Sequence, residues 1–253
     1  AEAAPGGSAA GHAPRTIAVE EVRAGMTGYG LTVFRGTRPE RFEVKVIDVL
    51  RKFLPRQDII LIECEDERLK HMGIVAGMSG SPIYLRTTDG DKLAGALAYG
   101  WHFSKDPIAG VTPIAAMLAE ADRPLRGRAN TPGAAAHNEA PSPPPEALAR
   151  RGEPGSPELY PATVPLSVAG FGPRAFAELG KWLEPYGITP MAAGGGGGGD
   201  GEGSDEPARF EPGGAIAVQL IRGDMSAAGT GTVTWVDGDR VLAFGHPMFN
   251  LGE

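Results

Sequence analysis

The chain has 253 residues, enough for one large hydrophobic core or two small ones, and its 38 glycines and 23 prolines exceed what an ordinary globular domain contains. Its formal net charge of -7 at pH 7 argues against a nucleic-acid partner, because affinity for a phosphate backbone depends on clustered lysine and arginine. Cys64, the single cysteine, excludes an intramolecular disulfide and is expected to be a small core residue. No run of about 18 apolar residues occurs, so no integral membrane segment is predicted.

Composition divides the chain into parts that are expected to fold and parts that are not. Residues 1–15 are predicted to be a disordered N-terminus; their small and polar residues are what a cleaved signal peptide leaves behind, so we expect an exported protein, located in the periplasm, the cell envelope or outside the cell. Residues 126–161 and 191–209 are rich in proline, glycine and charge and are predicted to be disordered linkers, because they cannot bury enough apolar surface to offset the entropy of ordering.

Residues 16–125 have the pattern of an antiparallel β domain, because β-branched and aromatic residues cluster between glycine, proline and charged breakers. The predicted strands are residues 30–34, 42–49, 58–63, 82–85 and 93–99. Phe42, Val44 and Val46 alternate with residues of the opposite face, which predicts a strand with one buried side. The Asp89-Gly90 pair predicts a hairpin turn, and residues 114–120 predict a helix.

The second half of the chain contains fewer elements. Residues 162–190 are predicted to be a short α/β piece, with a strand at 164–168 and an amphipathic helix at 173–183. Residues 210–253 are predicted to be a β segment that is truncated, with strands at 215–220, 230–236 and 240–244. Such a segment has too few strands to be stable alone.

The most specific string in the chain is GIVAGMSGSPI, at residues 73–83. It places Ser79 in a tight turn between hydrophobic segments, with Gly77 and Gly80 on either side. A nucleophilic serine needs an exposed hydroxyl and nearby backbone N–H groups aimed at the developing oxyanion, and glycines let a substrate carbonyl approach. Ser79 is therefore the candidate nucleophile, whereas Ser81 is expected to have a packing or turn role.

This Gly-x-Ser-Gly-x-Pro frame resembles the active-site serine segment of chymotrypsin-like peptidases. More closely, residues 42–118 resemble the SpoIVB peptidase family, bacterial serine endopeptidases of sporulation signalling that have a Gly-Met-Ser-Gly-Ser-Pro motif. The resemblance implies a mainly β protein with an antiparallel chymotrypsin-like barrel in residues 16–125. It also implies that Ser79 is the nucleophile and that the N–H groups of Gly77 and Ser79 form the oxyanion hole.

A second stretch, residues 229–247, resembles the hairpin that leads to the catalytic histidine of that family. It ends in Gly245-His246-Pro247 where the family has Gly-His-Gly, so the resemblance implies that His246 is the general base. In the family the histidine half precedes the serine half, and here the order is reversed. Either the halves are permuted or the chain is the first of repeated units, and chain order alone does not exclude catalysis.

Two further residues bear on the site. Tyr29, between Gly28 and Gly30, takes the place of the histidine in a second segment similar to Gly-His-Gly; if that segment fills the histidine position, the unit is a degenerate peptidase. Asp66 is the candidate third member of the triad, since the family has an aspartate at a similar distance before its serine. That match needs a two-residue gap, and the alternative for Asp66 is a solvated acidic turn.

The other four histidines are weaker candidates for the base. His12 and His137 lie in tracts predicted to be disordered, and His71 is expected to face solvent. His102 is expected to have a structural or substrate-contact role, with the base as its alternative role. The histidines and the cysteine have no zinc-type spacing, so neither a metal nor a cofactor is predicted.

The sequence thus predicts a serine endopeptidase that cleaves protein or peptide substrates through an acyl-enzyme intermediate. In this prediction Ser79 attacks, His246 transfers the proton and Asp66 orients the imidazole. The alternative is a catalytically inactive peptidase-like β-barrel that binds peptides or proteins at the cell envelope. Substrate preference and oligomeric state do not follow from the sequence.

Overall fold

The computed structural model describes residues 15–54, 57–70, 76–101, 107–123, 159–162, 164–183, 188–192 and 209–247. The predictions for residues 1–14, for most of the two linkers and for residues 248–253 lie outside these ranges. The four weaker histidine candidates, His12, His71, His102 and His137, lie outside them too.

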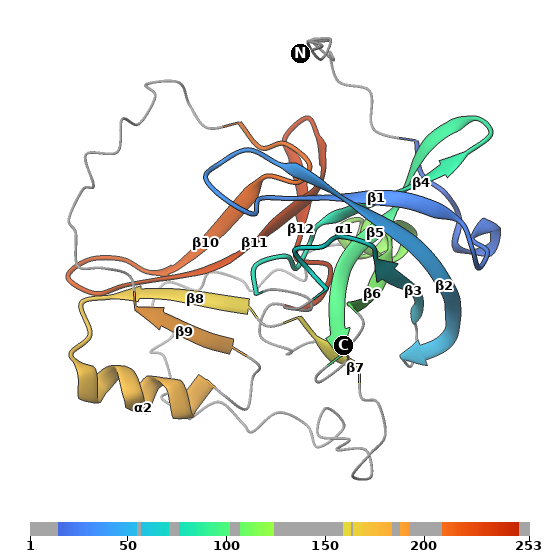
Figure 1. Cartoon of the computed structure of the whole chain (residues 1–253). Helices are drawn as coiled ribbons and strands as arrows, with labels where there is room; N and C mark the ends of the chain where they lie inside the picture. Colours follow the sequence, from blue (N-terminus) through green and yellow to red (C-terminus); the bar gives the residue numbers. More distant parts are fainter. Residues whose placement is uncertain are drawn as a thin grey trace, which may run out of the picture.

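The first half of the chain forms a closed antiparallel barrel (Figure 1). Its neighbouring strands, in order around the barrel, are β4 (Pro82–Thr87), β1 (Thr27–Thr32), β2 (Glu40–Leu54), β3 (Gln57–Cys64), β6 (Ile108–Pro113) and β5 (Gly90–Trp101). Pairing of β4 with β5 closes the ring. The 3-10 helix η1 (Val19–Glu21) precedes β1, and helix α1 (Ile114–Ala121) follows β6. The prediction of a mainly β protein with a chymotrypsin-like barrel is confirmed.

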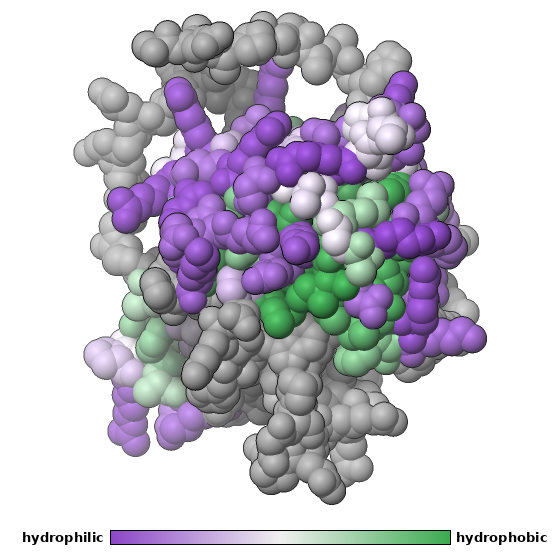
Figure 2. Space-filling model, turned by 45° about the vertical axis from the view of Figure 1, so that its right-hand side comes forward, coloured by the Kyte–Doolittle hydropathy of each residue, from purple (hydrophilic) through white to green (hydrophobic). Residues whose placement is uncertain are grey.

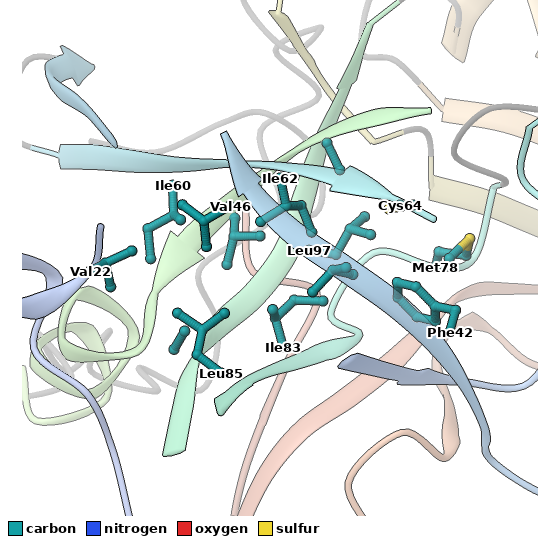
Figure 3. Packing of buried hydrophobic residues seen from close by; sticks show 14 of the residues in the cluster. Val22, Phe42, Val46, Ile60, Ile62, Cys64, Met78, Ile83, Leu85 and Leu97 are labelled. Atoms are coloured by element: carbon teal, nitrogen blue, oxygen red, sulfur yellow. The ribbon is translucent and has the colours of Figure 1, made fainter. Parts of the chain in front are cut away.

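The barrel core follows from the alternation of apolar and polar residues along its strands. On β2, Phe42, Val44 and Val46 are each 1% exposed, whereas the residues between them face solvent, as the period-2 pattern predicts. Figure 3 shows side chains from several strands meeting inside the barrel, with Ile62 and Leu97 among them. Burying these side chains removes apolar surface from water, which is the main stabilising contribution to the fold.

A second sheet of five strands is built by the rest of the chain. Its strands are β8 (Val164–Ala169), β9 (Ile188–Ala192), β10 (Ala215–Ile221), β11 (Ser226–Asp237) and β12 (Arg240–Ala243). Parallel β8 and β9 are connected through helix α2 (Pro173–Leu183), as parallel pairing requires, and α2 lies beside them in Figure 1. The three C-terminal strands that are too few to be stable alone are thus completed by the piece that precedes them.

Three strands were not predicted. β6 contains glycine and proline, β9 contains proline, and β7 (Leu159–Pro161) lies at the end of the segment that is predicted to be a linker, residues 126–161. β7 pairs antiparallel with the end of β5, so the last residues of that predicted linker are part of the barrel sheet. The second predicted linker, residues 191–209, likewise overlaps the last two residues of β9.

The two sheets meet along β11. Trp235 on β11 packs with Leu93 of β5 and Ile114 of α1, and the three side chains are nearly fully buried. Gly213 N–H donates to the Val233 carbonyl at 2.8 Å, and a Cβ on Gly213 would lie 2.5 Å from the Cβ of Leu31 on β1. On the face shown in Figure 2, hydrophilic side chains cover most of the described surface and a hydrophobic area lies to one side.

Candidate active site

The nucleophile turn, residues 77–81, lies between the barrel and β11. Gly77 and Gly80 both have positive φ, +96° and +97°, a conformation that side chains other than glycine rarely adopt. A Cβ on Gly80 would lie 2.1 Å from the Thr232 carbonyl oxygen, so only glycine allows β11 to approach this closely. Gly80 N–H donates to the Leu97 carbonyl at 2.7 Å, which joins the turn to β5. The glycines that the motif contains are therefore required by its surroundings.

A sharp turn after β12 brings His246 to the same place. Phe244 and Gly245 have φ of 67° and 73°, and the Gly245 N–H donates back to the Ala243 carbonyl at 2.8 Å. Thr112, on β6, donates its hydroxyl to the Gly245 carbonyl at 2.7 Å. A Cβ on Gly245 would lie 2.8 Å from the Cβ of Ala96, so glycine allows the turn to pack directly on β5.

Ser79 and His246 meet in space although 167 positions separate them in the chain. The Ser79 Oγ lies 2.6 Å from the His246 Nε2. The His246 Nδ1 lies 2.9 Å from the Pro247 carbonyl, which can only accept a hydrogen bond, so Nδ1 has the proton. In the neutral ring, Nε2 is then free to accept the hydroxyl proton of Ser79, which is the arrangement that general-base activation of a serine needs.

A second acceptor competes for the same hydroxyl proton. The Phe244 carbonyl oxygen lies 2.6 Å from the Ser79 Oγ. When His246 is protonated, its Nε2 becomes a donor to Ser79 Oγ, and the hydroxyl proton then points to the Phe244 carbonyl. When His246 is neutral, the hydroxyl can turn to Nε2. Only the neutral imidazole therefore leaves Ser79 ready for activation.

Burial keeps the imidazole neutral at pH 7. It lowers the pKa of His246 below its ordinary value, because the charged form loses hydration, and the carbonyls of Pro247 and Ala162 oppose this shift by accepting hydrogen bonds from the ring. The Tyr99 ring lies beside His246, with 6.4 Å between the ring centroids. Burial raises the pKa of Tyr99 to about 12, so Tyr99 is also neutral.

Asp66 lies elsewhere in the structure, in the turn after β3. Its carboxylate accepts hydrogen bonds from Arg68 at 2.9 Å, and the hydrogen bond from this guanidinium holds the pKa of Asp66 below its usual range. Arg68 also contacts Glu40 at 2.8 Å and lies over the Phe34 ring. Within the described ranges, His246 is contacted by backbone carbonyls where a triad would have a carboxylate, and Asp66 is not brought to it. No sequence signal marks a carbonyl for this role.

The predicted oxyanion-hole residues, Gly77 and Ser79, are held by threonines that the sequence analysis missed. Thr232 donates its hydroxyl to the Gly77 carbonyl at 2.9 Å and its N–H to the Ser79 carbonyl at 2.8 Å. Thr234 donates to the Gly80 carbonyl at 2.7 Å. The N–H groups of Gly77 and Ser79 form no hydrogen bond with any other described residue. The only signal for these threonines was the Thr-Gly-Thr-Val-Thr pattern of β11, which strand propensity explains equally well.

Tyr29 and Cys64 are placed away from the reaction centre, whereas Ser81 is buried at the end of the nucleophile turn. Tyr29 stacks on Tyr84, with 5.3 Å between the ring centroids, and the histidine position beside Ser79 is filled by His246. Cys64 is 1% exposed, and burial raises the pKa of its thiol to about 12, which fits the predicted core role. Ser81 is fully buried, and its hydroxyl has no hydrogen-bond partner among the described residues.

Within the part of the chain that the structure describes, no group of histidine, cysteine or acidic side chains could hold a metal ion. No helix in the described ranges has the length and hydropathy needed to cross a membrane.

Comparison with known proteins supports the resemblance of the serine segment, residues 42–118, and does not cover the resemblance of residues 229–247. Residues 9–118 match the family model of the SpoIVB peptidase S55. This range ends where the resemblance was predicted to end, includes Ser79 and precedes His246. No curated protein and no solved structure matches the chain. Over residues 9–118 the chain is therefore similar to the SpoIVB S55 peptidases, which supports a serine peptidase-type function in general.

Proposed function

We propose that this chain is a serine endopeptidase that cleaves protein substrates through an acyl-enzyme intermediate, with Ser79 as nucleophile and His246 as general base. The observation that supports the proposal most directly is the 2.6 Å separation of Ser79 Oγ and His246 Nε2. A serine hydroxyl is a poor nucleophile at neutral pH unless a neutral imidazole at about this distance accepts its proton.

In the proposed reaction, Nε2 takes the hydroxyl proton as Oγ attacks the scissile carbonyl carbon. The negative charge that develops on the carbonyl oxygen is stabilised by the N–H groups of Gly77 and Ser79, which no other described residue occupies. His246 then donates the proton to the leaving amine, and the acyl group remains on Ser79. Water, deprotonated by the same imidazole, releases the acid product and restores the hydroxyl.

Among the described residues, the proposed base forms a dyad with Ser79, and a backbone carbonyl lies where a triad would have its carboxylate. Nδ1–H donates to the Pro247 carbonyl, which fixes the tautomer and the ring orientation as the aspartate of a triad does. A carbonyl has only a partial charge, so it stabilises the imidazolium of the transition state less than a carboxylate does. An imidazole held by a carbonyl and not by an aspartate is expected to be a weaker base than the histidine of a full triad.

The alternative, an inactive barrel that binds peptides, is favoured by one observation: Ser79 is 0% exposed, so no substrate reaches its hydroxyl in the conformation described. The two functions predict opposite outcomes with a probe of serine nucleophilicity. A peptidase is labelled at Ser79 by a fluorophosphonate, whereas an inactive barrel binds peptide and is not labelled.

The test measures the rate of fluorophosphonate labelling by intact mass for the wild type and three variants. We expect Ser79→Ala to abolish labelling, and His246→Gln to lower its rate by about 10³-fold or more, as loss of the base does in other serine peptidases. Asp66→Asn is the matched acidic control and should label at the wild-type rate, because Asp66 pairs with Arg68.

Labelling of Ser79→Ala at the wild-type rate would remove Ser79 from the reaction. A loss of labelling in Asp66→Asn, with the thermal unfolding midpoint unchanged, would restore the triad and reject the dyad.

A further inference from the structure

One edge of β5 has three successive partners, and the active site lies at their junction. β4 pairs with β5 as far as Ala96. The nucleophile turn follows, since Gly80 N–H donates to the Leu97 carbonyl at 2.7 Å and Leu97 N–H donates to the Ser81 carbonyl at 2.9 Å. Beyond Leu97, the same edge of β5 pairs with a segment distant in sequence, which begins with β7.

We call this segment the strap: its described residues are 159–162 and 164–165. Its ladder with β5 is antiparallel and pairs Leu159 with Trp101, Tyr160 with Gly100 and Pro161 with Tyr99. Ala162 N–H then donates to the Ala98 carbonyl at 2.7 Å. The strap therefore continues the hydrogen-bonded edge directly from the point where the nucleophile turn leaves it.

The strap also passes both functional parts of the site. The Ala162 carbonyl lies close enough to the His246 ring to oppose the lowering of its pKa. A few residues on, the Pro165 Cγ lies 3.7 Å from the position of a Cβ on Gly77, at the turn that is proposed to hold the oxyanion. Ala162 is 8% exposed and Ser79 is 0% exposed, so both are buried in the conformation that holds the strap on β5.

An endopeptidase must hold an extended stretch of polypeptide beside its nucleophile. The free edge of a strand does this with its own N–H and C=O groups, to which a peptide adds as a further strand. The edge of β5 at residues 98–101 is the part that adjoins Ser79, and the strap uses its hydrogen-bonding groups in the antiparallel sense. The strap therefore stands where an extended peptide would have to bind.

We propose that residues 98–101 of β5 form the substrate-binding edge, and that the strap occupies it as an internal competitor that an extended polypeptide substrate displaces. The inference rests on the proposed peptidase function. Because Ala162, the strap residue that donates to the Ala98 carbonyl, is buried, the occupant that fits this position on β5 is a peptide with a small residue there.

The β7 part of the strap is suited to displacement because its ladder with β5 is short. β7 has three residues, and Pro161 has no N–H group to donate to the ladder. A short ladder of this kind opens at a modest free-energy difference, so a substrate that makes the same backbone hydrogen bonds with additional contacts shifts the population to the open form.

The test removes one strap hydrogen bond. Ala162→Pro deletes the N–H that donates to the Ala98 carbonyl, and proline remains compatible with extended backbone. One backbone hydrogen bond in a buried setting corresponds to roughly a tenfold change in the closed-to-open ratio, so fluorophosphonate should label Ser79 about tenfold faster than in the wild type. Ala18→Pro is the matched control, because Ala18 is exposed with φ of -71° and lies outside the site; it should label at the wild-type rate.

The outcomes separate the strap from the proposed function. If the wild type labels at Ser79 and Ala162→Pro labels no faster while it stays folded, the strap proposal is wrong and the peptidase remains. If neither the wild type nor Ala162→Pro is labelled at Ser79, both the peptidase proposal and the strap proposal are rejected.

A second measurement does not depend on any strap variant. When Ser79 of the wild-type protein is phosphonylated by a peptidyl phosphonate ester, which loses its alcohol or phenol leaving group from phosphorus, the amide of Ala162 should lose its protection from hydrogen exchange, because the peptide takes its place on β5. Retained protection in the fully labelled protein contradicts the proposal.

Discussion

The barrel and the second sheet differ in how they bury their residues, although both contribute to one site. The barrel encloses a large cluster of nearly inaccessible side chains, with Phe42, Ile62 and Leu97 each at most 1% exposed. In the second sheet, the buried cluster consists of four residues beneath α2, and β10 is exposed along most of its length. The proposed nucleophile, Ser79, comes from the well-packed part and the proposed base, His246, from the sparsely packed part. The distance between them therefore depends on the docking of β11 and β12 onto the barrel.

This contrast has a physical consequence for stability. A closed barrel leaves no unpaired strand edges and surrounds its core, whereas the second sheet is open and its edge strand β10 is exposed along most of its length. Val218, Leu220 and Ile221 on β10 are 37–43% exposed, so they add little to burial. The second sheet gains much of its burial from the barrel, where Trp235 packs on Leu93.

The difference in burial between the barrel and the second sheet is tested first by a valine-to-alanine substitution in each. Val44→Ala, at a position 1% exposed on β2, should lower the free energy of unfolding by about 2 kcal/mol, from lost burial and the cavity that remains. Val218→Ala, on β10, should change it by less than about 0.5 kcal/mol. Chemical denaturation of both variants measures the difference. Equal losses would mean that the second sheet is packed as tightly as the barrel.

A second prediction concerns the seam between the two regions. Thr232→Val keeps the shape of the side chain and removes the hydroxyl that donates to the Gly77 carbonyl. Loss of one buried hydrogen bond, about 1 kcal/mol, should lower the labelling rate of Ser79 roughly fivefold to tenfold, because the nucleophile turn is less firmly held. Thr232→Ser retains the hydroxyl and should restore most of the rate. If valine and serine variants label alike, β11 does not position the turn through this contact.

The smallest expected effect is a shift in the pH at which fluorophosphonate labelling of Ser79 is half of its maximum rate. The base must be neutral to accept the proton of Ser79, so labelling should fall as the pH drops through the pKa of His246 and stay level above it. Because burial lowers that pKa, the midpoint should lie below the ordinary histidine value of 6.5. A labelling profile from pH 4 to 9, taken over the range in which the protein stays folded, measures it. A midpoint above 6.5 would indicate a carboxylate at the imidazole.

Much of the fold could be predicted because it depends on local pattern. The alternation on β2, the Asp89-Gly90 turn and the amphipathic helix at 173–183 each follow from residue types at short range, and the structure has all three. β6, β7 and β9 were missed because glycine and proline interrupt them, and they are strands only by virtue of a partner that is distant in sequence.

The site divides in the same way. The motif around Ser79 and the Gly245-His246 segment could be found from residue identity, since glycine is needed wherever φ is positive or backbones approach closely. Asp66 could not be decided, because a carboxylate bonds whichever cation the fold brings to it, and here that cation is Arg68. The contact of Ala162 with His246 had no signal at all, since it is made by a backbone carbonyl that every residue has.

The sequence by itself determined that a glycine-flanked serine and a histidine hairpin exist, and that a β-rich protein surrounds them. Only the tertiary structure decided that these segments meet, that backbone carbonyls are the described neighbours of His246 Nδ1, and that residues 159–162 pair with β5 beside the nucleophile turn. The reason is that turns and strand faces depend on neighbours within a few residues, whereas hydrogen bonds between distant backbones depend on how the two sheets close on each other.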